Sequence, residues 1–320
     1  MRVVLPRSVR RHPARLLLSA AAVAALAATS ACSTSSPAKT SSSGTGGSKT
    51  IQVVAAENFW GSIATQLGGE HVKVTSIITN PDTDPHSYEP TAADGRTVAG
   101  ADYAITNGIG YDAWSDKLLA ANPASGRTVL KVGDLVGKKE GDNPHQWYSH
   151  DSVYKVIDQI TADYKKIDPA DAAYFDSQKQ SFETQTLAKY NQLEADIKAK
   201  YADTPIGASE SIVTPLAESV GLKMLTPETF LDAESEGTDP TAADKATIDQ
   251  QISGKQIKIY VYNTQNSNPD VVAQVNAAKA QGIPVAQVTE TLAPASATFQ
   301  DWQTGELQGI ADALKAATGK

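Results

Sequence analysis

The stretch Asp168–Tyr201, DPADAAYFDSQKQSFETQTLAKYNQLEADIKAKY, decides the fold. Asp168 is a good N-cap, and Pro169 suits the first helical position because its missing N–H has no helical partner there. Apolar side chains recur mostly at helical spacings, and neither proline nor glycine interrupts residues 170–201. They are Phe175, Phe182, Leu187, Tyr190, Leu193 and Ile197. About 33 residues form a helix of roughly 50 Å, which is long enough to join two lobes.

Short apolar runs alternate with helical patterns on both sides of this stretch. Before it, strands are expected at 50–56, 72–78, 103–106 and 128–132, with helices at 59–67 and 114–121. After it, strands are expected at 205–208, 223–225, 257–262 and 284–288, with helices at 215–220, 239–252, 269–281 and 299–317. Such alternation predicts an α/β fold. We expect two lobes, each a mainly parallel sheet flanked by helices, joined by one long rigid helix.

The composition narrows the possible functions. With 320 residues, of which 41% are hydrophobic, the chain can form more than one core. It has 28 basic and 36 acidic residues, and five of the basic ones are arginines within residues 1–31, so the remainder is strongly acidic. This argues against nucleic-acid binding and against docking to an anionic membrane through protein charge. The single cysteine excludes an internal disulfide, zinc sites with several cysteines, and CxxC redox motifs.

The first 49 residues read as an export signal and a tether. A basic region ending at Arg15 precedes the apolar run 16–26, which is too short to span a membrane. Cys32 follows Thr29-Ser30-Ala31, which resembles a bacterial lipoprotein processing site except that Thr29 stands where leucine is usual. Residues 33–49 are only Ser, Thr, Gly, Ala, Pro and Lys, a composition typical of flexible linkers. We expect a signal peptide at 1–31, a tether at 32–49, an N-terminal lobe at 50–166, a linking helix at 167–202 and a C-terminal lobe at 203–320.

Two of the four histidines that follow the signal lie in similar loops. His86 and His145 each follow a proline, which holds the preceding residue out of a helix. The His86 loop comes just after a predicted strand, and the His145 loop enters a helix; loops past the carboxyl ends of parallel strands are where α/β sheets bind ligands. Taken singly, each histidine is more typical of a surface or capping residue. Two Pro-His loops in similar settings shift that balance, so the pattern alone leaves metal binding and a structural role about equally supported. His71 and His150 read as surface residues.

The body of the chain resembles the cluster A-I solute-binding proteins of ATP-binding cassette transporters, which deliver zinc or manganese. The motifs are Ala55-Ala56-Glu57-Asn58-Phe59-Trp60, Asp84-Pro85-His86-Ser87-Tyr88-Glu89-Pro90-Thr91, Asn107-Gly108-Ile109-Gly110-Tyr111-Asp112 and Asn143-Pro144-His145-Gln146-Trp147. Weaker support comes from 207–210, 261–265 and 288–292. The resemblance runs over residues 50–317, which is nearly the whole body that follows the tether. It implies one metal ion between the lobes, with two ligands from each lobe.

The resemblance also implies which residues bind the metal. His86 and His145 match the two histidines of the N-terminal lobe, and Glu210 falls where the family has His or Glu. Glu290 follows the last strand, where the family usually has Asp or His, and its longer side chain is a departure. An exposed acid that caps the following chain is the alternative for Glu290. Asn266 is an alternative ligand, and Glu57 and Asn58 either orient a ligand histidine or cap the following helix.

The types of donor atom in this predicted ligand set are compatible with two metals. Two imidazoles and two carboxylates give a set richer in oxygen than a three-histidine set, which favours manganese slightly. Zinc outcompetes manganese at most nitrogen and oxygen sites by intrinsic affinity, so both Zn²⁺ and Mn²⁺ are expected cargoes.

The resulting hypothesis is a metal-binding receptor that serves an ABC permease and has no enzymatic activity. It would be a monomer, lipid-anchored through Cys32 on the outer face of the cytoplasmic membrane of a bacterium, with no nucleic-acid partner. Two alternatives remain: an exported metalloenzyme with a two-histidine-one-carboxylate site, and a surface adhesin. The sequence lacks the His-Glu-x-x-His and Gly-x-Ser-x-Gly motifs of common hydrolases, which argues against the enzyme.

Overall fold

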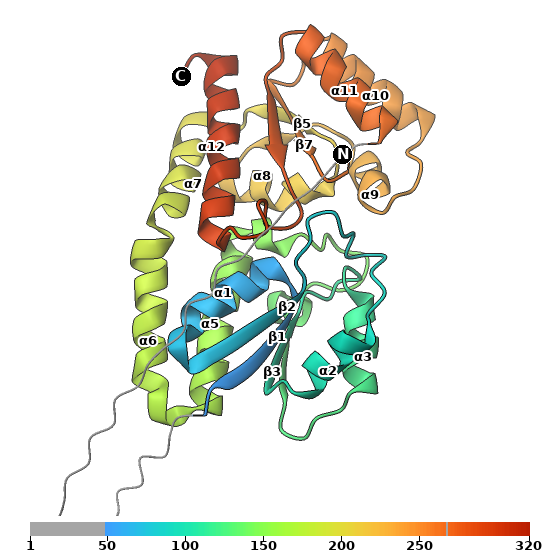
Figure 1. Cartoon of the computed structure of the whole chain (residues 1–320). Helices are drawn as coiled ribbons and strands as arrows, with labels where there is room; N and C mark the ends of the chain where they lie inside the picture. Colours follow the sequence, from blue (N-terminus) through green and yellow to red (C-terminus); the bar gives the residue numbers. More distant parts are fainter. Residues whose placement is uncertain (1–48, 267) are drawn as a thin grey trace, which may run out of the picture. The chain divides into compact units, whose positions relative to one another are not determined.

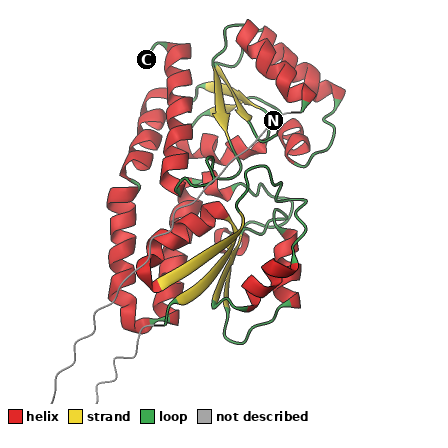
Figure 2. Ribbon diagram, in the orientation of Figure 1, coloured by secondary structure: helices red, strands yellow, loops and turns green. Residues whose placement is uncertain are grey.

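The computed structural model describes residues 49–266 and 268–320, which hold two four-stranded sheets (Figures 1 and 2). In the N-terminal lobe, β1 (Ile51–Glu57), β2 (Val72–Ile78), β3 (Tyr103–Thr106) and β4 (Thr128–Lys131) lie in the order β2-β1-β3-β4. In the C-terminal lobe, β5 (Pro205–Ala208), β6 (Lys223–Met224), β7 (Ile259–Asn263) and β8 (Val285–Val288) lie in the order β6-β5-β7-β8. Every strand pair in these sheets is parallel, so the two lobes share one topology and the α/β prediction is confirmed.

Helices cover both sheets, and the central strands are accordingly buried along nearly their whole length. The N-terminal lobe has α1 (Asn58–Gly68), α2 (Ala92–Ala99), α3 (Ala113–Ala121), α4 (Val132–Val136) and α5 (His150–Ile167). The C-terminal lobe has α8 (Thr214–Val220), α9 (Glu228–Ser235), α10 (Ala242–Ser253), α11 (Pro269–Ala280) and α12 (Phe299–Thr318). In the described part of the chain, no helix combines the length and the apolar character needed to cross a membrane. The predicted signal, Cys32 and all but the last residue of the predicted tether lie outside this part.

The linking segment differs from the single uninterrupted helix expected over residues 167–202. A short 3-10 turn at Pro169–Asp171 leads into α6 (Ala172–Ser181), and a π-helical turn at Phe182–Thr186 separates α6 from α7 (Ala188–Tyr201). The Leu187 N–H donates to Phe182 O at 2.8 Å. The cause is the five-residue spacing from Phe182 to Leu187: the wider turn lets both side chains face the core, where each is at most 2% exposed. Figure 1 shows α6 along the N-terminal lobe and α7 along the C-terminal lobe.

The two lobes share one apolar core. A single cluster of buried side chains runs from Ile51 in β1 to Leu314 in α12. At its centre, Phe59 of α1 stacks on Trp147 with ring centroids 4.1 Å apart and lies 6.4 Å from the ring of Trp302 in α12. The C-terminal helix thus packs against the N-terminal lobe, which resists a wide separation of the lobes.

Candidate metal centre

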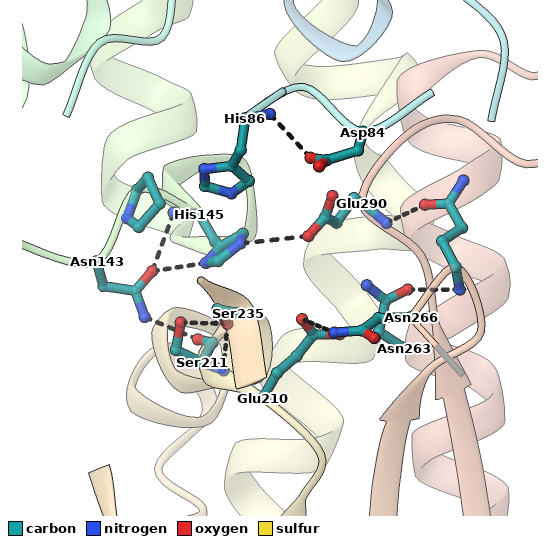
Figure 3. A network of polar contacts seen from close by, with 12 residues as sticks. Asp84, His86, Asn143, His145, Glu210, Ser211, Ser235, Asn263, Asn266 and Glu290 are labelled. Atoms are coloured by element: carbon teal, nitrogen blue, oxygen red, sulfur yellow. Dashed lines mark hydrogen bonds and ion pairs between the residues drawn. The ribbon is translucent and has the colours of Figure 1, made fainter. Parts of the chain in front are cut away.

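Three of the four predicted ligands converge at the carboxyl ends of the strands. His86 lies in the loop 79–91 between β2 and α2, His145 lies between α4 and α5, and Glu290 follows β8. One ligand atom from each lies within 4.8 Å of the ligand atoms of the other two (Figure 3). A tetrahedral ion with bonds near 2.1 Å holds its ligand atoms about 3.4 Å apart, so a small contraction would close this group on an ion.

His145 is held in the form that binds metals. It is fully buried, and Asn143 Oδ1 accepts from its backbone N–H at 2.9 Å and lies 3.0 Å from its Nδ1. Because Asn143 Nδ2 donates to Ser211 O at 2.7 Å, the oxygen must face the imidazole, so Nδ1 carries the hydrogen. Nε2 then has a free lone pair; it has no hydrogen-bond partner among the described residues and lies 3.8 Å from Glu290 Oε1. Burial lowers the pKa of His145 although Glu290 opposes this, so the ring is neutral at neutral pH.

His86 reaches the group from an exposed loop. Its ring packs edge-on against Tyr111, with centroids 4.8 Å apart, and its backbone N–H donates to Asp84 Oδ1 at 2.9 Å. The indole N–H of Trp114 donates to Pro85 O at 3.1 Å, directly before the histidine. The loop that carries His86 is therefore fixed to the N-terminal lobe next to the histidine itself.

Glu210 lies outside this group of three. It is 1% exposed, Asn266 Nδ2 donates to its Oε2 at 3.4 Å, and its Oε1 has no hydrogen-bond partner among the described residues. Burial raises the pKa of Glu210 well above its ordinary value, and the charge of Glu290 adds to this effect. A cation between the two carboxyl groups would reverse both contributions, because it favours the ionised form. The buried, unpartnered Glu210 Oε1 and His145 Nε2 therefore suit a bound cation.

The two polar residues where β1 meets α1, Glu57 and Asn58, have separate surroundings. Glu57 is fully buried, and its carboxyl oxygens have no hydrogen-bond partner among the described residues. Burial, and then the neighbouring Asp112, raise the pKa of Glu57 well above its ordinary value. Asn58 Oδ1 accepts from the backbone N–H of Leu292 at 3.3 Å, two residues beyond Glu290, so it holds that loop against α1. Neither side chain belongs to the group of three.

Sequence reasoning gave no role to three residues that shape this site. The buried Tyr111 hydroxyl has no hydrogen-bond partner among the described residues, and the Tyr111 ring contacts the rings of both histidines. Asn143 fixes the tautomer of His145, and Gln265 accepts from the Glu290 N–H at 2.6 Å. The motifs around residues 107–112 and 143–147 contained the first two. Gln265 lies in the weaker motif at 261–265, but that motif did not reveal its role, because its partners are distant in sequence.

A second group of side chains of the types that bind metals lies in the N-terminal lobe, at the junction of α5 and α6. Ligand atoms of His71, Asp168 and Asp171 lie within 4.8 Å of one another, and His71 Nδ1 is 2.8 Å from Asp171 Oδ2. The His71 ring also packs on Tyr174 at 4.3 Å, so this expected surface residue is paired and partly buried. Asp168, predicted as an N-cap, makes no side-chain capping bond. These contacts are those of a packed junction between two helices.

Comparison with known proteins decides the family. Residues 53–313 match the family model described as "Zinc-uptake complex component A periplasmic", ZnuA. The chain belongs to this family. This ZnuA-family chain is 25% identical over 250 residues to "Manganese-binding lipoprotein MntA" of Bacillus subtilis, covering 75% of the chain and 80% of that protein. It is 26% identical over 266 residues to "Zinc-binding lipoprotein AdcA" of Streptococcus pneumoniae, again over 75% of the chain but only 49% of that protein.

Solved structures share the fold of this ZnuA-family chain. An S38A mutant of a Mn-bound periplasmic metal binding protein from Candidatus Liberibacter asiaticus superimposes with a TM-score of 0.69 and 21% sequence identity. The match covers 82% of this chain and 98% of that one. The two-lobe α/β architecture is thus that of known metal-binding proteins, in agreement with the resemblance found in the sequence.

The buried carboxyl groups predict an unusual pH dependence of the metal-free protein. Burial raises the pKa of Glu306 to about 8, and it raises the pKa values of Glu57 and Glu210 well above their ordinary value. Between pH 6.5 and 8 the folded state therefore binds more protons than the unfolded state, so its stability falls as pH rises. His145, whose pKa is lowered in the folded protein, makes the stability rise with pH, but only below its pKa in the unfolded chain, about 6.5. We expect a loss of about 1.4 kcal/mol per pH unit for each carboxyl that keeps its proton on folding.

Urea unfolding of the chelator-treated protein at pH 6.5, 7.2 and 8.0 measures this dependence. A free energy of unfolding that rises with pH across this range would show that these carboxyl groups are ionised in the folded protein.

Proposed function

We propose that this protein is an extracytoplasmic receptor that captures one zinc or manganese ion between its lobes and delivers it to an ABC permease. The observation that carries the proposal is the convergence of His86 and His145 from one lobe with Glu290 from the other. In this proposal residues 50–166 and 203–320 are the lobes, and Glu210 completes the ligand set from the C-terminal side. The names of the relatives, which specify manganese for one and zinc for another, support a divalent transition metal.

The remaining parts of the proposal follow from the sequence and the family. Cys32 would carry the lipid that tethers a monomeric body to the outer face of the cytoplasmic membrane. We propose no catalytic activity, because the family is one of metal-uptake components and the ligands come from opposite lobes. Two imidazoles with two carboxylates suit both metals, with a slight preference for manganese from the oxygen content.

Release would require only a small movement of the lobes. Tyr148 donates to Thr289 O at 2.8 Å, and Asn143 donates to Ser211 O at 2.7 Å, so backbone next to Glu290 and Glu210 is bonded to the other lobe. With the shared aromatic core behind the site, wide opening would break many contacts. We propose that docking to the permease shifts the loops that carry the ligands and so weakens the site.

Elemental analysis of the metal-stripped, reloaded full-length protein tests the function. We expect one Mn²⁺ or Zn²⁺ ion per chain after dialysis. A chain that retains neither ion after exposure to both would overturn the proposal.

Metal affinity should also fall as pH falls. The ion must displace protons from its ligands, and histidine has an ordinary pKa of about 6.5. We expect the affinity for Mn²⁺ to drop about tenfold or more per pH unit below that value. Titration calorimetry at pH 7.5, 6.5 and 5.5 measures the affinity, and an affinity that stays constant over this range would contradict the proposed set of histidine and carboxylate ligands.

A further inference from the structure

The loop that carries His86, residues 79–91, is bonded to both lobes. On its own side, Trp114 donates to Pro85 O at 3.1 Å. On the opposite side, Gln265 Nε2 donates to Pro81 O at 2.6 Å, and Gln265 comes from the loop after β7 in the C-terminal lobe. The second bond therefore joins the two lobes through the loop that carries the predicted ligand His86.

The other end of the same amide holds Glu290. Gln265 Oε1 accepts from the backbone N–H groups of Glu290 at 2.6 Å and Thr291 at 3.2 Å, and Nε2 also donates to Thr291 Oγ1 at 2.9 Å. This orientation of the amide is fixed by chemistry: the two backbone N–H groups need an acceptor, and the Pro81 carbonyl needs a donor. The Gln265 backbone N–H in turn donates to Asn263 Oδ1 at 2.9 Å, so the residue itself is anchored.

We propose that Gln265 is a latch that sets how long the metal ion is held. This inference rests on the proposed function. One side chain connects the His86 loop to the Glu290 backbone, so the two predicted ligands cannot separate without breaking the bond from Gln265 to Pro81. The bond is partly buried and adds to the barrier that an opening movement must cross. Gln265 is a positioning residue, because it acts through the backbone of the loops that carry the ligands.

Two substitutions distinguish a latch role of Gln265 from a role that only supports the backbone of Glu290. Gln265→Met keeps the size of the side chain and removes all of its hydrogen bonds. Gln265→Glu keeps an acceptor for the Glu290 and Thr291 N–H groups but cannot donate to Pro81 O. The matched control is Gln287→Met, because Gln287 is exposed in the same lobe and its amide donates to Tyr262 Oη at 2.7 Å.

The measurement is the rate at which the full-length protein releases Mn²⁺ to excess chelator, together with the association rate. We expect both Gln265 variants to release the ion about tenfold faster, with association rates and the Gln287→Met control unchanged. The negative charge in Gln265→Glu would by itself slow the loss of a cation, so faster release by this variant points to the lost bond.

Three outcomes contradict the latch. If only Gln265→Met releases the ion faster, the residue merely supports Glu290. If neither variant differs from a wild-type protein that binds the ion normally, the latch is wrong and the proposed function stands. If the wild-type protein holds no ion, the proposed function fails and the latch fails with it.

Discussion

Alanine at both His86 and His145 is expected to remove the metal ion from the purified protein. The double substitution deletes both nitrogen donors of the predicted set and leaves carboxylates on the opposite lobe. Residues that only orient a ligand change metal affinity by about 10- to 100-fold, so losing two direct donors should exceed roughly 1000-fold. Elemental analysis after dialysis measures the retained ion.

The control for this experiment removes the same number of imidazoles elsewhere. His71 pairs with Asp171 and His150 with Glu194, and neither histidine belongs to the group formed by His86, His145 and Glu290. His71→Ala plus His150→Ala should therefore keep one ion per chain. Equal metal content in the two double variants, whether retained or lost, would contradict the assignment of His86 and His145.

Substitution of either predicted carboxylate ligand by glutamine should have opposite effects on the empty and the loaded protein. Glu210 is buried, and Glu290 disfavours its ionised form. Glu210→Gln removes the cost of keeping this carboxyl protonated in the folded state, and Glu290→Gln removes the charge that adds to that cost, so the metal-free protein should gain about 1 kcal/mol and melt a few degrees higher. The same variants lose a direct donor, so metal affinity should drop by at least about 100-fold and the metal-induced rise in Tm should largely disappear.

Glu57→Gln is the matched control for Glu210→Gln and Glu290→Gln. It also removes a buried carboxyl with a raised pKa, but Glu57 is outside the group of three. We expect a higher Tm for the metal-free variant together with a normal shift on adding Mn²⁺. Thermal unfolding with and without the ion gives the Tm of the metal-free variant and the rise in Tm on adding Mn²⁺. Loss of this rise in Glu57→Gln alone would move the ligand role from Glu210 to Glu57.

The sheets could be predicted from the sequence because their central strands are short apolar runs covered on both faces, and such runs can be recognised without knowledge of distant contacts. The linking segment was harder. Its apolar residues suggested one helix, but the five-residue step from Phe182 to Leu187 is satisfied by a π turn, since only the core determines which side chains must be buried. No bounds were predicted for α5, which has 18 residues.

The candidate site likewise contains residues that could be predicted from the sequence and residues that could not. The resemblance to the metal-binding family implied that His86, His145 and Glu290 would meet, and they do lie together. Their role as ligands, and that of Glu210, stays a prediction. Gln265 and Tyr111 could not be found this way, since the meaning of each depends on partners from other loops.

The shared core extends the effect of the ion beyond its ligands. Because one buried cluster runs from β1 to α12, the lobes cannot unfold separately without exposing it. A bound ion stabilises the folded chain by RT ln(1 + [L]/Kd), and this free energy then opposes every opening that passes through global unfolding. Amide exchange and proteolytic cleavage would slow in strands that never touch the metal. In the proposed receptor, the external supply of metal would therefore also determine how long each molecule survives among extracytoplasmic proteases.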